Sequence, residues 1–462
     1  MEITNDNRRA HQELSDCSLK FLEFVKEDPG RLNRSNYKGL ETPDPKWVLQ
    51  PWPTFVGPHM ANALREASTS VFKIIKSLLP RFFSYDLEQI SRYYEIPMDI
   101  TQYFLYGVSD DHIDNLLARG DFIISPSSGL KCIEFNVSSN LGGAQLPVWE
   151  TMCMRMPIIA EFLRRYNIKI TNKNLLSILM EHIISITRSR IPIDDELNIV
   201  IAFTNSGQYI ADPREHAYTN QLYQEILRRR YNSLKGEAIF CDYSKLKIEN
   251  NHLYYRDKEV HFLLEFNNGT APFPMRIAHE KGNALIYNGL VTKLVSNKLN
   301  IALMSEHQDS DIFTPRERET IKKYIPWTRK VKEGETTYNN QKIKLEDFII
   351  SNREQLVLKP GEGLGGVDVY PGYTTPEYQW RQVVEKAFRK KNWLVQEHVD
   401  SYPYLYQYGK EGYAEHNVVW GTFVFGNQYG GSWLRIQPRE NPIGIINIAQ
   451  QAEITILFEV KE

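Results

Sequence analysis

The segment from Gly120 to Gly143, GDFIISPSSGLKCIEFNVSSNLGG, places the strongest constraint on how this chain folds. It begins with an apolar run, Phe122–Ile124, which is followed by the turn-forming sequence Ser125–Gly129. Residues 132–137 then alternate between polar and apolar side chains, which is typical of a strand with one buried face. The segment therefore predicts two short antiparallel strands joined by a polar turn.

Symmetric pairing of these strands about the turn places Asp121 opposite Glu134 and Arg119 opposite Asn136. Two carboxylates and an amide oxygen are ligands that suit Mg²⁺, which usually completes its shell with water and phosphate. The guanidinium group suits phosphate itself. The hairpin is thus a candidate metal and phosphate site. The alternative is an ordinary hairpin with polar residues on its solvent face.

The size and charge of the chain exclude several classes of protein. At 462 residues it is too long for one small core, so two or three domains are expected. Its formal net charge of -2 gives no support for nucleic acid as a partner. Four scattered cysteines without paired metal-ligand spacing fit a reducing compartment. With no signal-peptide pattern and no apolar run of about 18 residues, we expect a cytoplasmic protein that has no membrane partner.

Helical patterns dominate the first part of the chain. We expect residues 1–115 to form an N-terminal, mainly helical region, and residues 116–189 to combine the predicted hairpin with further helices. The helical segments predicted here are 10–30, Met60–Leu79, Leu87–Tyr94, Leu146–Tyr166 and Leu175–Ile186.

Residues 190–310 have the β-α-β order of a small doubly wound domain. The almost continuous apolar run Leu197–Phe203 predicts a strand that is buried on both faces of a parallel sheet. A helix over His216–Tyr231, a strand over Ala238–Phe240 and a further buried run over Leu299–Met304 follow. Thr204–Gly207 is a possible anion-binding loop, but it lacks the glycine spacing of a dinucleotide site and is interpreted as a plain loop.

Residues 311–462 contain a second candidate phosphate site. A predicted strand, Gln355–Pro360, carries Lys359 next to its end and is followed by the glycine-rich loop Gly361–Gly366. Backbone N–H groups in such a loop can approach phosphate closely, and the lysine adds a point charge. A plain glycine hairpin is the alternative. An amphipathic helix over Glu377–Lys390 and a strand over Trp393–Val399 follow.

Together these motifs resemble the ATP-grasp superfamily in its circularly permuted form, the group that includes glutathionylspermidine synthases. Arg119–Asp121 and Glu134–Asn136 are similar to the Arg-x-Asp and Glu-x-Asn elements of that group. Leu356–Gly366 is similar to its nucleotide strand and glycine loop, and Leu394–Glu397 to the hinge that reads adenine. The expected fold class is therefore α/β, an ATP-grasp fold in permuted order. A doubly wound pre-ATP-grasp domain over residues 190–310 and the N-terminal helical region would complete it.

The resemblance implies an ATP-dependent ligase that joins a small-molecule carboxylate to an amine through an acyl phosphate. It implies that two Mg²⁺ ions are held by Asp121, Glu134 and Asn136, and that Arg119 stabilises the transferred phosphoryl group. The implied ATP ligands are Lys359, the backbone of Gly363, Gly365 and Gly366, and the hinge residues Gln396 and Glu397. Amide or peptide bond formation in natural-product biosynthesis is the expected setting.

The sequence departs from the family pattern at the first of two nucleotide lysines, which has no clean match. Arg329 or Lys330 occupies about the right place, and we assign the role to Arg329. Arg435 and Asn447 are candidates for substrate or phosphate contacts, with a surface strand residue and a turn residue as the respective alternatives. The candidates for the acceptor carboxylate, with helix capping as the alternative, are Ser138, Ser139 and Asn140.

Two other functions remain compatible with these motifs. One is a catalytically silent ATP-binding or scaffold protein that keeps the fold. The other is a ligase that uses a thiol or a protein side chain as the acceptor. The sequence leaves the oligomeric state open, with a homodimer among the options.

Overall fold

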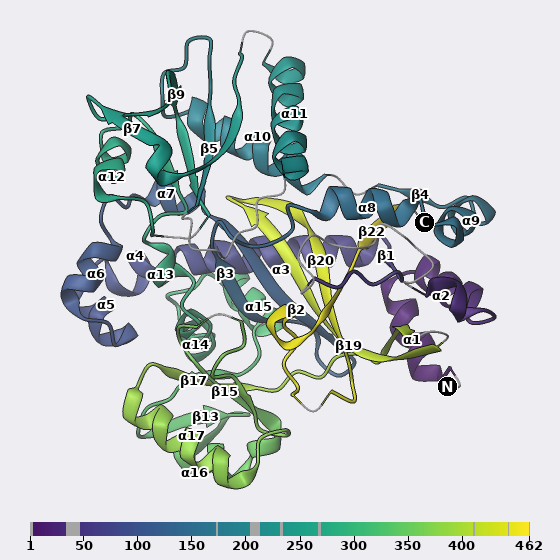
Figure 1. Cartoon of the computed structure of the whole chain (residues 1–462). Helices are drawn as coiled ribbons and strands as arrows, with labels where there is room; N and C mark the ends of the chain where they lie inside the picture. The colour runs from purple at the N-terminus through teal and green to yellow at the C-terminus, as the bar shows by residue number, and fades with distance from the viewer. Residues whose placement is uncertain are drawn as a thin grey trace.

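The computed structural model describes residues 3–33, 47–171, 174–203, 213–231, 234–266, 269–363, 365–409, 412–441 and 443–461. It is a mixed α/β fold with several separate sheets, as Figure 1 shows, which confirms the predicted α/β class. The ATP-grasp identification and the four-part division of the chain stay predictions. The predicted loop Thr204–Gly207 lies outside the described residues.

The N-terminal region is mainly helical, as predicted. Its helices are α1 (Asn5–Leu14), α2 (Asp16–Val25), α3 (Pro58–Lys76), α4 (Leu78–Phe83), α5 (Leu87–Tyr94), α6 (Met98–Phe104) and α7 (Asp110–Asp114). The helical pattern over residues 10–30 forms two helices instead of one, because Ser15 has an extended backbone and caps α2 through its side chain.

A six-stranded antiparallel sheet forms the centre of the molecule. Its order is β21-β20-β19-β2-β3, and β18 also pairs with β19. The strands are β2 (Leu117–Ser125), β3 (Gly129–Val137), β18 (Tyr404–Tyr408), β19 (Gly412–Phe425), β20 (Gln428–Pro438) and β21 (Glu453–Thr455). The predicted hairpin and its register are confirmed, since Asp121 pairs with Glu134 and Arg119 with Asn136.

The long helix α3 covers one face of this central sheet (Figure 1). Phe72 of α3 stacks on Phe135 of β3 with 5.0 Å between ring centroids. Gly120 leaves room for this packing, because a Cβ atom there would lie 2.7 Å from the Phe135 ring. Side chains alternate along a strand, so Arg119 and Asp121 point to the opposite face.

A four-stranded parallel sheet has the order β11-β10-β5-β6 and confirms the parallel pairing predicted for the run at residues 197–203. The strands of this sheet are β5 (Ile199–Phe203), β6 (Ala238–Asp242), β10 (Phe262–Glu265) and β11 (Leu285–Tyr287). The helices of the same part of the chain are α10 (Leu175–Arg188), α11 (Pro213–Arg230) and α12 (Phe273–Glu280). The buried run Leu299–Met304 is not part of this sheet but forms helix α14 (Leu299–Glu306).

A third sheet, at the bottom of Figure 1, has the order β12-β17-β15-β16. Its strands are β12 (Thr328–Lys330), β15 (Leu356–Pro360), β16 (Tyr370–Pro371) and β17 (Trp393–Glu397), flanked by the hairpin β13 (Glu335–Tyr338) and β14 (Gln341–Lys344) and by helices α16 (Leu345–Ser351) and α17 (Glu377–Lys390). The predicted helix at residues 377–390 is confirmed with the same bounds, and the predicted strand at residues 355–360 is confirmed except that it begins one residue later, at Leu356.

The remaining elements connect these three parts. They are β1 (Thr54–Val56), α8 (Leu146–Met154), α9 (Pro157–Arg165), β4 (Lys169–Ile170), β7 (Leu246–Glu249), β8 (His252–Tyr255), β9 (Lys258–Val260), α13 (Thr292–Val295), α15 (Pro315–Tyr324) and β22 (Leu457–Lys461). Strand β1 pairs with β22, so segments near the two ends of the chain lie side by side. None of the described helices combines the length and apolarity that crossing a membrane requires.

Candidate functional site

Asp121 lies at the centre of a polar cluster on the face of the central sheet opposite α3. Its side chain is 1% exposed. Arg119 donates to it from Nε at 2.8 Å and from Nη2 at 3.1 Å. Asn136 donates from Nδ2 at 3.0 Å, and Nη2 of Arg435 lies 2.7 Å from Oδ2. Strands β2, β3 and β20 therefore bring together four of the predicted site residues.

Two opposing effects determine the pKa of Asp121. Burial alone would raise the pKa of Asp121, but the guanidinium groups of Arg119 and Arg435 outweigh that effect and hold its pKa below the usual range. Asp121 is therefore a carboxylate at neutral pH. One carboxylate faces two guanidinium groups, which leaves an excess of positive charge beside it.

Glu134 is the more accessible carboxylate of the cluster, with 24% of its side chain exposed. Its Oε1 accepts a hydrogen bond of 3.1 Å from Nδ2 of Asn136. Its Oε2 lies 3.8 Å from Nζ of Lys298, a residue that the sequence did not single out. Lys298 also donates from Nζ to the carbonyl of Gly363 at 2.8 Å, and so connects Glu134 to the glycine loop.

Arg435 is 4% exposed, and its Nε has no hydrogen-bond partner among the described residues. The surface-strand alternative for this residue is therefore wrong. Neighbouring Gly421 of β19 pairs with Asp121 on one side and Trp433 on the other. A Cβ atom at Gly421 would lie 2.5 Å from Nε1 of Trp433 and 3.0 Å from Cδ of Arg119. Only glycine leaves space for both side chains.

Lys359 approaches the cluster from the third sheet. Its Nζ donates to the main-chain carbonyl of Ile133 in β3 and to Oε1 of Gln396, each at 2.9 Å. Burial lowers the pKa of Lys359 to about 8, an effect that the nearby carboxylate of Glu134 opposes. The two motifs that the sequence treats as separate candidates thus lie next to each other.

The glycine loop follows Lys359 and packs against residues near Asn447. Gly363, Gly365 and Gly366 have positive φ angles of 137°, 70° and 77°, which are unfavourable for other residues. A Cβ atom at Gly366 would lie 2.7 Å from Ile445. Asn447 is next to this loop, but its Oδ1 accepts from the N–H of Ala449 and caps a short 3₁₀ turn.

The structure does not bring Arg329 to the cluster. Arg329 pairs with Val395 in the third sheet, whereas Lys330 and Lys359 both pair with Leu394. Paired residues point to the same face, so Arg329 points away from Lys359 and Lys330 shares its face. The guanidinium of Arg329 instead bonds to Ser305, Thr336 and Thr337 and holds the β13–β14 hairpin. On that face Nζ of Lys330 donates to the main-chain carbonyl of Tyr93 at 2.6 Å and lies 3.4 Å from Oε1 of Glu95.

The hinge residues have partners within the chain. The side-chain Oε1 of Gln396 accepts from Lys359, and its Nε2 donates to Oγ1 of Thr328 at 3.0 Å. The backbone N–H of Glu397 donates to the carbonyl of Trp327 at 2.8 Å. Gln396 therefore orients the lysine, and the Glu397 N–H takes part in the pairing of the sheet.

The segment Ser138–Asn140 connects the cluster to the parallel sheet. Ser138 accepts from the N–H of Asn140, and the side chain of Ser139 accepts from the N–H of Asn288 at 2.9 Å. Helix α8 begins only at Leu146, so these residues do not cap it. Asn140 is exposed, which leaves it accessible to a ligand.

The donor set suits Mg²⁺ in its chemistry, since it consists of carboxylate and amide oxygens. Both oxygens of Asp121 already accept hydrogen bonds, so a cation at Asp121 requires Arg119, Arg435 or Asn136 to release it. Glu134 is accessible without such a change. Within the described ranges no group of three or more His, Cys, Asp and Glu side chains gathers as a metal site.

Sequence reasoning missed Lys298 and the role of Trp433. Lys298 immediately precedes the apolar run of α14, and a lysine beside a buried run is the only signal for it. The Arg119 guanidinium lies 5.6 Å from the centre of the Trp433 ring. Comparison of the chain with family models and with curated proteins gives no match, so the site is characterised by its geometry alone.

Proposed function

We propose that this chain is an ATP- and Mg²⁺-dependent ligase that joins a carboxylate to an amine through an acyl phosphate. One observation carries the proposal. The oxygen ligands and arginines of β2, β3 and β20 lie beside Lys359, which comes from a different sheet and is 226 residues away in sequence from Ile133, its contact in β3. Such an assembly of cation ligands and phosphate-binding cations is what phosphoryl transfer requires.

Glu134, Asn136 and Asp121 are the residues that would hold Mg²⁺ in this account. When bound, Mg²⁺ would neutralise the negative charge that builds on the phosphate oxygens during transfer. Arg119 and Arg435 would bind and orient the transferred phosphoryl group. In the absence of ligand both arginines pair with the carboxylate of Asp121. A bound phosphate would take the guanidinium groups as partners in place of Asp121, which would free this carboxylate to hold the cation.

Lys359 would bind the ATP phosphates as a buried point charge, positioned by Gln396. The unpartnered Nε of Arg435 supports an anion in the same place, because a buried N–H group without an acceptor is costly. An acyl phosphate hydrolyses readily, so the site must exclude water. A neutral amine attacks the acyl phosphate directly, and this step needs no general base from the protein.

A second candidate function is an ATP-binding protein without ligase activity. It is favoured by the contacts of Asp121, whose carboxylate already accepts hydrogen bonds from Arg119 and pairs with Arg435. This arrangement is stable without any ligand. A ligase with a thiol or protein side-chain acceptor differs only in the nucleophile. A cytoplasmic location belongs to the same proposal.

The experiment is turnover of Mg²⁺-ATP by the purified chain with pooled carboxylates and amines, read by mass spectrometry. The proposal expects ADP, phosphate and a product lighter than its two substrates by one water. ATP binding without ADP release in any pool, amine or thiol, would support the silent protein instead. Lys359→Met is the test variant, and Lys342→Met, at an exposed position on β14, is the matched control.

A further inference from the structure

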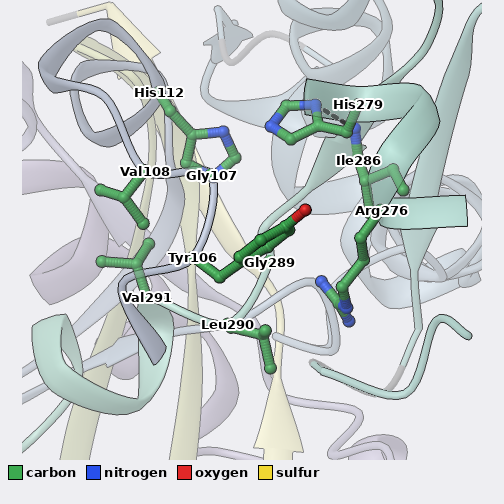
Figure 2. Close-up of a pocket in the computed structure, with 10 residues that line it drawn as sticks. All are labelled: Tyr106, Gly107, Val108, His112, Arg276, His279, Ile286, Gly289, Leu290 and Val291. Carbon is green, nitrogen blue, oxygen red and sulfur yellow. Dashed lines mark hydrogen bonds between the residues drawn. The ribbon is translucent and has the colours of Figure 1, made fainter. Parts of the chain in front are cut away.

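A small pocket lies at the carboxyl ends of β10 and β11 in the parallel sheet, where ligands of such sheets commonly bind. Figure 2 shows His112 and His279 at one end of it and Arg276 and Leu290 at the other. Its volume is about 20 Å³, which exceeds the 10–15 Å³ or so that one water needs. The pocket therefore has room for the end group of a ligand rather than for a whole molecule.

Two buried polar atoms in this pocket have no hydrogen-bond partner among the described residues, Nδ1 of His112 and Nε of Arg276. The two residues are only 4% and 6% exposed. Native proteins rarely leave such atoms unpaired. Both therefore point to a ligand that supplies one donor and one acceptor.

The protonation of His112 follows from its other ring nitrogen. Nε2 lies 2.9 Å from the carbonyl of Asn288, which accepts only, so Nε2 carries the proton. The pKa of His112 is lowered to about 3, mainly because the ring is buried. The nearby side chains of His279, Arg190 and Arg276 lower it further. The ring is thus neutral at physiological pH, and its bare Nδ1 needs an N–H or O–H donor.

Arg276 supplies the complementary group. Its Nη2 donates to Glu265 at 2.6 Å, and Glu265 also accepts from the backbone N–H groups of Ala271 and Gly289. Nε–H remains for an acceptor in the pocket. Arg276 and Arg190 also lower the pKa of His279, after burial, to about 4. The field at both imidazoles is therefore positive, which favours an anionic acceptor over an ammonium group.

We propose that this pocket binds a carboxylate flanked by a neutral N–H or O–H group, with Arg276 receiving the carboxylate and His112 the neighbouring donor. The C-terminal residue of a peptide and an α-hydroxy acid both carry this chemistry. The proposal does not rest on ligase activity, because it concerns binding alone.

The pocket is connected to the polar cluster through Asn288. Asn288 exchanges hydrogen bonds of 2.8 Å with both backbone groups of Leu117, and its N–H donates to Ser139. Leu117 begins β2, and Asp121 follows four residues later, about 13 Å at the usual rise of a strand. A hydrogen-bonded path from His112 through Asn288 to β2 thus connects the pocket to the strand that carries Asp121.

The test is binding of five small probes to the whole chain labelled with ¹⁵N at histidine, followed through the ring nitrogens of His112 and His279. We expect N-acetylglycine and glycolate to bind at least tenfold more tightly than acetate, which lacks the donor, and than glycine, whose ammonium group is disfavoured. N-acetylglycinamide, which lacks the carboxylate, is expected not to bind. Tighter binding of N-acetylglycine indicates a peptide ligand, and tighter binding of glycolate a hydroxy acid.

Variants separate the pocket from adventitious binding. Arg276→Lys keeps a cation for Glu265 but removes Nε–H, and it is expected to weaken binding at least tenfold. Val108→Phe fills the pocket from a partly exposed loop position and should abolish binding without loss of folding. His252→Gln, at a partly exposed position on β8, is the control. Equal binding of N-acetylglycine and N-acetylglycinamide, or unchanged binding in both pocket variants, would overturn the proposal.

Discussion

Lys359 donates a hydrogen bond of 2.9 Å to the main-chain carbonyl of Ile133, a residue in a different sheet and 226 positions earlier in the chain. Ile133 immediately precedes Glu134, the accessible carboxylate of the polar cluster. The contact therefore joins a lysine that precedes a glycine loop to a strand that carries the proposed cation ligands. The proposed nucleotide site depends on this junction.

The lowered pKa of Lys359 predicts that ATP affinity depends on pH. The ammonium group is lost as the pH rises through about 8, so ATP affinity should fall above that value. The contribution of Lys359 to the free energy of unfolding changes in the opposite direction. The ordinary lysine pKa is 10.5, so between about pH 8 and 10.5 this lysine is protonated in the unfolded chain but not in the folded one. Its contribution therefore makes folding more favourable as the pH rises through this range.

Isothermal titration of ATP between about pH 7 and pH 9.5 checks this prediction. Lys359→Arg keeps its charge over that range and should keep its affinity above pH 8. A Lys359→Met variant with the same pH profile as the unmodified chain would show that another group is responsible.

Asp121→Asn should destabilise the fold. The change removes the carboxylate that contacts Arg119 and Arg435, and it leaves the two buried guanidinium groups with only the more distant carboxylate of Glu134 as a counter-charge. Loss of one partner in a buried ion pair costs about 3–5 kcal/mol in free energy of unfolding. Chemical denaturation measures the loss, and Asp257→Asn on an exposed turn is the control. An unchanged denaturation midpoint would mean that the cluster does not contribute to folding.

Gly421→Ala should disturb the cluster without replacing any charged residue. The new methyl would lie 2.5 Å from Nε1 of Trp433 and 3.0 Å from Cδ of Arg119, so both side chains must shift. We expect a loss of about 1–3 kcal/mol in stability together with weaker ATP binding. Gly412→Ala, in the same strand, meets only the Tyr408 carbonyl at 3.2 Å and serves as the control. Normal ATP affinity in Gly421→Ala would separate Arg119 from the nucleotide.

Arg329→Lys tests whether Arg329 is structural. The change breaks hydrogen bonds to Thr336 and Thr337 that hold the β13–β14 hairpin, and it should cost about 1–3 kcal/mol in stability. ATP affinity should stay within about twofold of the unmodified chain. Lys330→Gln, by contrast, should weaken ATP binding, because Lys330 shares a sheet face with Lys359. Loss of ATP binding in Arg329→Lys with full stability would restore the role predicted from sequence.

Local patterns in the sequence were sufficient to predict the hairpin. A turn sequence and a period of two determine which residues pair, so Asp121 opposite Glu134 followed without any knowledge of the rest of the fold. The helix at residues 377–390 was predictable for the same reason, since its apolar face repeats with the helical period.

The sequence did not predict the position of side chains whose direction depends on segments far away in the chain. The face on which Arg329 lies depends on its register with β17, and the inward direction of Arg435 depends on the β19–β20 pairing. The run Leu299–Met304 is buried nearly all round, and such a run has no period that separates a helix from a strand. Lys298 reaches Glu134 only because α14 begins beside the glycine loop.

The most direct test of the central claim is ATP affinity with and without Mg²⁺ in Glu134→Gln and Lys359→Met. If the proposed cation ligands and Lys359, the proposed phosphate-binding lysine, belong to one site, Glu134→Gln should remove the Mg²⁺ dependence of ATP binding. Lys359→Met should weaken binding at least tenfold while keeping that dependence. ATP binding that equals that of the unmodified chain in both variants would contradict the account.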